Sequence, residues 1–253
     1  MNQVAEKKTA GLPSNIFEED AAKGLGKIGQ EDLALPFLKI LGQLSPEVNK
    51  RDGKYVEGSE PGMIFNSVSG ELYDGVKGID VIPCFYKLEY IEWKDRGEGP
   101  GAPVAIYDSS SDIMSKTKPD ANYKDRLPSG NYIEKTASHF VIITGDSPST
   151  ALISMKSTQL KISRKWNSKM SGIKWKGQNG NLYTPASFSH IYRLKTTQMS
   201  NDKGTWFGWE VSTVGKNTDA TLYNQAKSFS ESISKGAVRA KHGEDKPKDQ
   251  GII

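Results

Sequence analysis

The chain has 253 residues, of which 36% are hydrophobic and 25% are charged, and its formal net charge is +4. This composition is typical of a water-soluble globular protein, and no apolar run is long enough for a membrane-spanning helix. Cys84 is the only cysteine, which excludes an intramolecular disulfide and argues against a thiolate metal site. The polar start of the chain shows no secretory signal, so we predict a cytoplasmic protein without a membrane partner.

The two ends of the chain are expected to lie outside the folded domain. Residues 1–30 are small, charged and glycine-containing, and they are predicted to form a disordered arm. Within this arm, residues 24–29 match G-x-G-x-x-G, but no strand precedes them, which argues against a dinucleotide site. Residues 31–240 are expected to form a single domain. Residues 241–253, in which acids and lysines alternate, are predicted to be a disordered tail.

Several segments carry the apolar and β-branched patterns of strands. They are residues 63–65, 79–93, 138–144, 150–155, 188–197 and 205–214. Pro83 lies inside the second of these segments and indicates an edge or a bulge there. Residues 145–149 suit a hairpin connection, whereas the stretch 95–130 is predicted to be mostly loop.

Two segments have the period of amphipathic helices. The first is predicted over residues 157–171, with Ser157 as its N-cap and Gly172 as its stop. Its apolar stripe would consist of Ile162, Trp166, Met170 and Ile173. The second helix is predicted over residues 219–234. The elements together predict a mainly β (α+β) fold with two or three helices and long loops.

Basic residues are concentrated in one segment of the chain. Residues 147–201 contain nine Lys or Arg side chains and no Asp or Glu, which leaves the rest of the chain with more acids than bases. Segregation of this kind creates a local positive field that attracts polyanions. Within the first helix, Lys161, Lys165 and Lys169 recur every four residues, so they line a different face from the apolar stripe.

The pairing of cations with aromatic rings in and after this segment is what single-stranded nucleic acid requires, because cations contact phosphates and exposed rings stack with bases. The candidate phosphate contacts are Lys161, Arg164, Lys165, Lys169, Lys174, Lys176, Arg193 and Lys195. The candidate stacking rings are Trp175, Tyr192 and one of Trp206, Phe207 and Trp209. Trp166 lies on the apolar stripe and is expected to be a core residue instead.

No motif in the chain indicates a catalytic or cofactor site. The three histidines have no metal-binding spacing, and neither a nucleophile elbow nor a phosphate-binding loop is present. We therefore predict a protein that is not an enzyme and needs no cofactor or metal. One alternative stays open, in which acids such as Glu89, Glu92, Asp108 and Asp112 meet in space to form a metal-dependent nuclease site.

Residues 35–40, 61–66, 154–161 and 206–209 give the chain a resemblance to a group of tailed-bacteriophage single-stranded DNA-binding proteins associated with replication and recombination. The resemblance implies an OB-fold, which is a five-stranded β-barrel, elaborated by helices and crossed by DNA on one face. Proteins of this kind often end in a strongly acidic tail that recruits partners, and the mixed charges after residue 241 depart from that pattern.

The sequence thus predicts a sequence-tolerant single-stranded DNA-binding protein that coats and protects unwound phage DNA in the host cytoplasm. Its expected partners are single-stranded DNA or RNA, replication or recombination proteins, and further copies of itself. Two alternatives stay open. One is a recombination protein that anneals strands or acts as a nuclease, and the other is a virion or host-interaction protein.

Overall fold

The computed structural model describes residues 15–21, 23–24, 26, 33–95, 97–99, 101–202, 204–238, 240 and 242. The chain divides into two units, residues 1–33 and 34–253. The first contains a four-residue helix, α1 (Ile16–Glu19). Most of the predicted arm, with part of its glycine-rich motif, lies outside the described residues, as does the predicted tail apart from His242.

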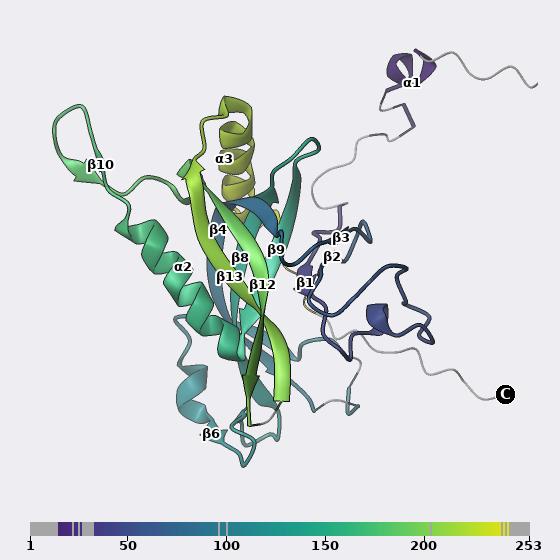
Figure 1. Cartoon of the computed structure of the whole chain (residues 1–253). Helices are drawn as coiled ribbons and strands as arrows, with labels where there is room; N and C mark the ends of the chain where they lie inside the picture. The colour runs from purple at the N-terminus through teal and green to yellow at the C-terminus, as the bar shows by residue number, and fades with distance from the viewer. Residues whose placement is uncertain are drawn as a thin grey trace, which may run out of the picture. The chain divides into compact units, whose positions relative to one another are not determined.

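A large antiparallel sheet dominates the second unit, and it curls into a half-barrel (Figure 1). Its strands follow the order β13 (Gly204–Lys216), β12 (His190–Asn201), β4 (Ile79–Trp93), β8 (Tyr132–Ile143), β7 (Asp125–Arg126) and β6 (Lys118–Pro119). Two further strands lie off this path, where β5 (Ala105–Asp108) pairs with β4 and β9 (Ser149–Lys156) pairs with β8.

Smaller elements complete the unit. A three-stranded sheet consists of β1 (Leu38–Ile40), β2 (Ile64–Asn66) and β3 (Leu72–Tyr73), and a short hairpin consists of β10 (Trp175–Lys176) and β11 (Leu182–Tyr183). The helices are α2 (Leu160–Gly172) and α3 (Ala220–Ser234). Single 3-10 turns occur at Pro46–Val48, Asp112–Lys116, Ser157–Gln159 and Ser187–Ser189.

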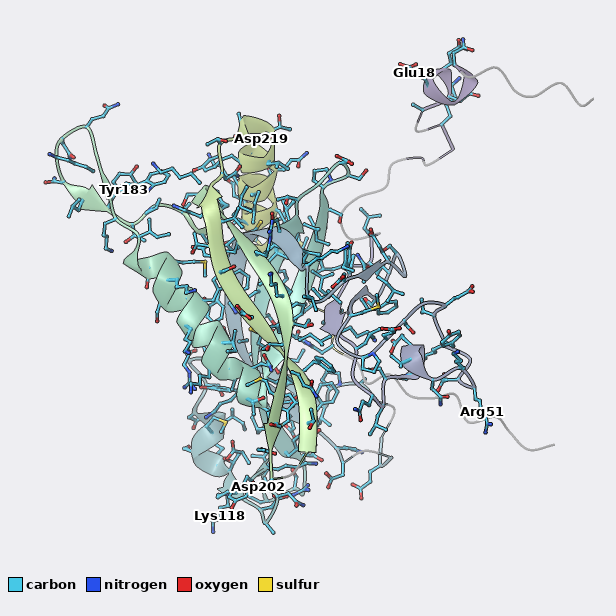
Figure 2. All side chains as sticks on the ribbon, viewed as in Figure 1. Glu18, Arg51, Lys118, Tyr183, Asp202 and Asp219 are labelled. Carbon is cyan, nitrogen blue, oxygen red and sulfur yellow. The ribbon has the colours of Figure 1, made fainter. Side chains whose placement is uncertain are left out.

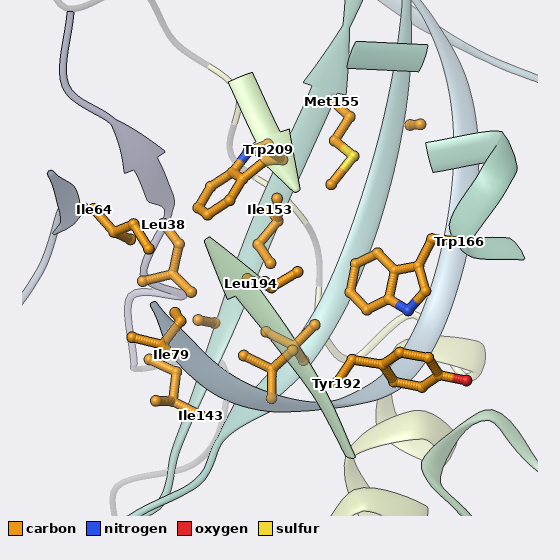
Figure 3. Packing of buried hydrophobic residues seen from close by; sticks show 14 residues of the cluster. Leu38, Ile64, Ile79, Ile143, Ile153, Met155, Trp166, Tyr192, Leu194 and Trp209 are labelled. Carbon is orange, nitrogen blue, oxygen red and sulfur yellow. The ribbon is translucent and has the colours of Figure 1, made fainter. Parts of the chain in front are cut away.

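Both faces of the central strands are buried. Side chains alternate along a strand, so Val141 joins one apolar cluster, which includes Trp166 of α2, while Phe140 joins a second, which includes Phe229 of α3. The two helices therefore cover opposite faces of the sheet. Burial on both faces explains why residues 79–85 and 140–143 are apolar almost without interruption. Figure 3 shows the first cluster, in which Trp166 projects from its helix toward Tyr192.

The structure confirms the predicted mainly β character, the six predicted strands and both helices. Pro83 lies at a register shift between β4 and β8, so its bulge is confirmed, although β4 is a central strand. Asp219 caps α3 by accepting hydrogen bonds from the backbone of Thr221 and Leu222. The predicted N-cap of the other helix is wrong, because Ser157 begins a 3-10 turn with a left-handed φ of 49° and α2 starts only at Leu160.

Gly78 joins the small sheet to β4 at a point where the chain passes close to β12. Its φ is +76°, and a Cβ atom there would lie 2.3 Å from the backbone oxygen of Leu194. Gly70 adopts the same left-handed backbone conformation, with a φ of +75°, but a Cβ atom there would meet open space. We expect Gly78→Ala to lower the free energy of unfolding by about 1–3 kcal/mol more than Gly70→Ala, because only the first forces packed backbone apart. Urea denaturation of both variants measures this difference, and equal losses would contradict it.

Candidate nucleic-acid interface

Helix α2 is anchored in the core by Trp166, which is completely buried. Its indole stacks on the imidazole of His139 with ring centroids 4.5 Å apart, and it meets Tyr192 edge-to-face at 5.7 Å. One turn earlier in the helix, the Ser163 hydroxyl lies 2.8 Å from Nε2 of His139. Burial lowers the pKa of His139 from 6.5 to about 3, so the imidazole is neutral at physiological pH. The predicted core role of Trp166 is confirmed.

The anchored face of α2 determines which side chains point outward. A shallow surface hollow is lined by Lys161, Arg164, Lys165, Ser168 and Lys169. These residues follow the three- and four-residue spacing of one helix face, and the four basic ones are exposed. The structure therefore brings together the four predicted phosphate contacts of this helix on one surface, which we call the α2 basic face.

Three cations of the α2 basic face, Lys161, Arg164 and Lys165, form no ion pair within the described part of the chain. Lys169 differs, because its Nζ donates a hydrogen bond of 2.9 Å to the backbone oxygen of Val211 in β13. Gln159 contacts the same strand, since its Oε1 accepts a 3.0 Å hydrogen bond from the backbone of Trp209. Lys169 thus also fastens the helix to the sheet, which the sequence did not indicate.

The β10–β11 hairpin follows directly after α2 and carries three more predicted site residues. Lys174 and Lys176 are exposed, and Lys174 donates a hydrogen bond to the Thr184 hydroxyl. Trp175 is only partly exposed, because its ring lies 5.7 Å from that of His190 and has the ammonium of Lys216 at 4.9 Å. The pKa of His190 is lowered by burial and by the charge of Lys216.

The predicted residues on β12 and β13 are mostly engaged in the fold. Tyr192 and Trp209 are buried in the core, so the prediction that Tyr192 stacks with bases is corrected, and Trp209 is excluded as a stacking ring. Arg193 forms two hydrogen bonds of 2.7 Å to Asp80 on β4, which neutralises its charge locally. Arg193 is nevertheless exposed, so its role as a phosphate contact stays a prediction.

The remaining predicted residues of these strands are partly buried. Lys195, Trp206 and Phe207 all belong to this class. Phe207 packs against Gly62, where a Cβ atom would lie 2.7 Å from its ring. Trp206 lines a second shallow hollow with Thr158 and Asn201. The structure thus separates the predicted set into an exposed group on α2 and the hairpin, and a largely structural group on β12 and β13.

A comparison with protein-family models matches residues 6–239 to the family described as Pam3 phage gp34-like protein. The chain belongs to this phage protein family. The match covers nearly the whole chain, including α2, the hairpin and both sheets. Searches of curated proteins and of solved structures found no match.

The acids proposed as an alternative nuclease site do not gather into one group in the described part of this phage protein, although Glu89 and Asp108 are cross-strand partners on β4 and β5. Glu89 and Glu92 are three residues apart on β4 and therefore point to opposite faces. Glu92 accepts hydrogen bonds of 2.6 Å from Tyr107 and from Asn131, whereas Glu89 contacts Lys87 at 2.7 Å and His242 at 3.4 Å. Burial would raise the pKa of Glu89, but hydrogen bonds from His242 and Lys87 outweigh it and lower the pKa.

Asp108 and Asp112 are likewise occupied separately, since Asp108 accepts hydrogen bonds from Ser110 and Asp112 pairs with Lys116 at 3.2 Å. Over the residues that the structure describes, no three His, Cys, Asp or Glu side chains are grouped so that they could hold a metal ion. Over the same residues, no helix is both long and apolar enough to cross a membrane.

Residues missed by the sequence reasoning complete the cationic surface. Ser168 lines the hollow between the basic side chains, Lys216 extends the positive charge onto β13, and Tyr183 lies on the hairpin opposite Trp175. Lys216 lies outside the acid-free segment, so charge counting along the chain could not find it. Tyr183 lies inside that segment, but only the structure shows that it is the cross-strand partner of Trp175.

Proposed function

We propose that this phage protein binds single-stranded DNA on the α2 basic face and the adjoining β10–β11 hairpin, without dependence on base sequence. The observation that carries the proposal is the row of exposed cations, of which Lys161, Arg164 and Lys165 have no ion-pair partner in the described structure. Solvated helix faces usually mix acids and bases, because opposite charges at this spacing stabilise a helix. A helix face whose charges are all positive lacks that stabilisation, and it suits a polyanionic ligand.

The geometry of the face agrees with an extended single strand. Lys161 and Lys165 are separated by about 6 Å along the helix axis, comparable with the spacing of successive phosphates in a stretched strand. The hairpin adds the exposed Lys174 and Lys176 directly after the C-terminal end of α2, so the row of cations continues along the chain. Aromatic rings beside such a row favour unpaired bases over duplex DNA, in which the bases are stacked on one another.

The phage family and the chemistry of the site support a proposed cellular role. In this proposal the protein is not an enzyme, and it coats and protects DNA that is unwound during phage replication or recombination in the host cytoplasm. The curled half-barrel would then be an elaborated OB-fold-like barrel. Its further partners would be replication or recombination proteins and other copies of the chain.

A salt titration of binding to labelled oligo-dT tests the proposal. If about five phosphates are neutralised, the logarithm of the binding constant should fall with the logarithm of salt concentration with a slope of about −3.5. The triple variant Lys161→Gln, Arg164→Gln, Lys165→Gln should bind much more weakly, and its slope should be smaller in magnitude by about 2, because three cations are lost. Fluorescence anisotropy measures both quantities.

A second triple variant provides the matched control. Lys50→Gln, Lys227→Gln, Lys235→Gln removes the same charge from exposed positions outside the α2 basic face. It should keep nearly the wild-type affinity and slope. Equal weakening by the two variants would mean that net charge rather than this face attracts DNA, and absence of any binding to oligo-dT would refute the proposed function.

A further inference from the structure

Strand β11 of the β10–β11 hairpin exposes two large side chains. The accessible fraction is 70% for Leu182 and 47% for Tyr183. The hairpin projects from the C-terminal end of α2, away from the sheet, and Tyr183 is carried on it (Figure 2). Soluble proteins expose single apolar side chains commonly, but here the exposed ring lies beside the row of cations of the proposed DNA site.

The pairing of the two short strands places the exposed ring on a supported face. Trp175 and Tyr183 are cross-strand partners, so they lie on the same face of the hairpin, and Lys176 pairs with Leu182 on the other. The two rings meet edge-to-face, with centroids 6.2 Å apart and planes at 85°. Because Trp175 also contacts His190 and Lys216, it is fixed to the body of the protein and holds Tyr183 in place.

The same contacts make Trp175 a poor stacking surface for a ligand. Its ring already has the Lys216 ammonium at 4.9 Å, the imidazole of His190 and the ring of Tyr183 as neighbours. Within the described part of the chain, neither an ammonium nor an imidazole group packs on the Tyr183 ring, and its accessible fraction is 47%. Lys216 places positive charge beside the pair, on Trp175, whereas Lys174 and Lys176 lie on the other face of the same short hairpin.

We infer that Tyr183 is the base-stacking residue of the site, with Trp175 as its positioning residue, and that its ligand is an unpaired nucleobase of any identity. The inference rests on the proposed function and deepens it, because it explains how a cationic surface would prefer single strands to duplexes. Stacking uses the flat face that every base possesses, so it adds affinity without sequence preference.

Two ligands of equal charge separate stacking from phosphate contacts. We would compare oligo-dT with an oligonucleotide of the same length that carries abasic sites. Tyr183→Ala should weaken binding to oligo-dT on the order of tenfold and leave binding to the abasic strand unchanged, since only the first offers a base. Tyr183→Phe keeps the ring and should keep the affinity. Tyr123→Ala removes another exposed tyrosine, in the 120–123 turn, and should change the affinity for neither oligonucleotide.

The salt dependence gives a readout that separates this inference from the proposed function. The slope of affinity against salt should be the same for Tyr183→Ala and wild type, because the ring carries no charge. If the α2 triple variant loses binding while Tyr183→Ala binds oligo-dT like wild type, or loses affinity equally for both strands, the stacking role is overturned and the proposed function survives. If wild type binds no oligo-dT, both are overturned.

Discussion

Replacing Trp166 with alanine should lower the free energy of unfolding by about 3–5 kcal/mol, the range for removing a fully buried tryptophan. The indole is completely inaccessible and packs between His139 and Tyr192 under α2. Its loss would leave a cavity at the contact that holds the helix to the sheet. The remaining polar tethers, from Gln159 and Lys169 to β13 and from Ser163 to His139 on β8, are single hydrogen bonds and are expected to contribute only about 1 kcal/mol each.

Urea denaturation followed by far-ultraviolet circular dichroism measures this loss without relying on tryptophan fluorescence. Ser168→Ala is the matched control, because Ser168 lies on the exposed face of the same helix. It should change the free energy of unfolding by no more than about 0.5 kcal/mol. A loss below about 1 kcal/mol for Trp166→Ala would contradict the anchoring role of the indole and would mean that α2 is held chiefly by other contacts.

Stability should also fall steeply as the pH drops below 6.5, and His139 should account for much of the fall. Burial lowers the pKa of His139 in the folded protein from 6.5 to about 3. Above pH 6.5 the imidazole is neutral in both states, so it has no effect there. Between pH 6.5 and about 3 only the unfolded chain binds the proton, and the free energy of unfolding should decrease by about 1.4 kcal/mol for each pH unit.

The variant His139→Gln isolates this contribution, since it retains hydrogen-bonding capacity toward Ser163 but does not titrate. Other groups also respond to acid, including His190 and the carboxylates of Asp95 and Asp120, whose pKa values are lowered. These groups are present in both proteins and should cancel when the two stability curves are subtracted. The difference should be constant above pH 6.5 and should change steadily below it. A constant difference throughout would show that His139 titrates normally in the folded state.

The two predictions concern the residues that orient the proposed DNA-binding surface. Trp166 faces the core, and Lys161, Arg164 and Lys165 lie on the opposite side of the same helix. Burial of Trp166 therefore turns these three cations toward solvent. A conformational change that released the indole would free α2 from the sheet, so its cations would lose their fixed position relative to the rest of the protein. For this reason the DNA affinity and the free energy of unfolding should both decrease in Trp166→Ala. The α2 triple variant should lose DNA affinity and keep its stability.

Local sequence patterns were sufficient to predict the five longest strands and the helices α2 and α3, but not the short strands β1, β3, β5, β6, β7, β10 and β11. The long strand at residues 79–93 and the helix at 219–234 follow from β-branched and aromatic residues in the first case and from a four-residue apolar period in the second. The stripe through Trp166 also predicted which face of α2 is buried. These features depend on neighbours within a few residues, and the period of the side chains reports them directly.

The site could be predicted only in part. Acid-free composition over residues 147–201 identified the α2 basic face correctly as an exposed cationic surface. It could not show that Arg193 is neutralised by Asp80, which lies 113 residues earlier in the chain, or that Tyr192 fills the core. Each of those outcomes depends on pairing between β12 and β4, and strand pairing at such separation leaves no local signature.

The acid-free segment was therefore determined by the sequence itself, as were its helix and the division of that helix into an apolar and a basic face. Only the tertiary structure decided which aromatic rings remain accessible. Tyr192 and Trp209 are enclosed because side chains from distant segments, including Trp166 of α2, pack in one cluster with them, and Trp175 is partly covered by His190 and Lys216. Tyr183 stays exposed because it lies on a hairpin outside the half-barrel, where no second layer packs against it. Exposure is a property of the packed molecule, since it depends on which distant segments arrive to cover a side chain.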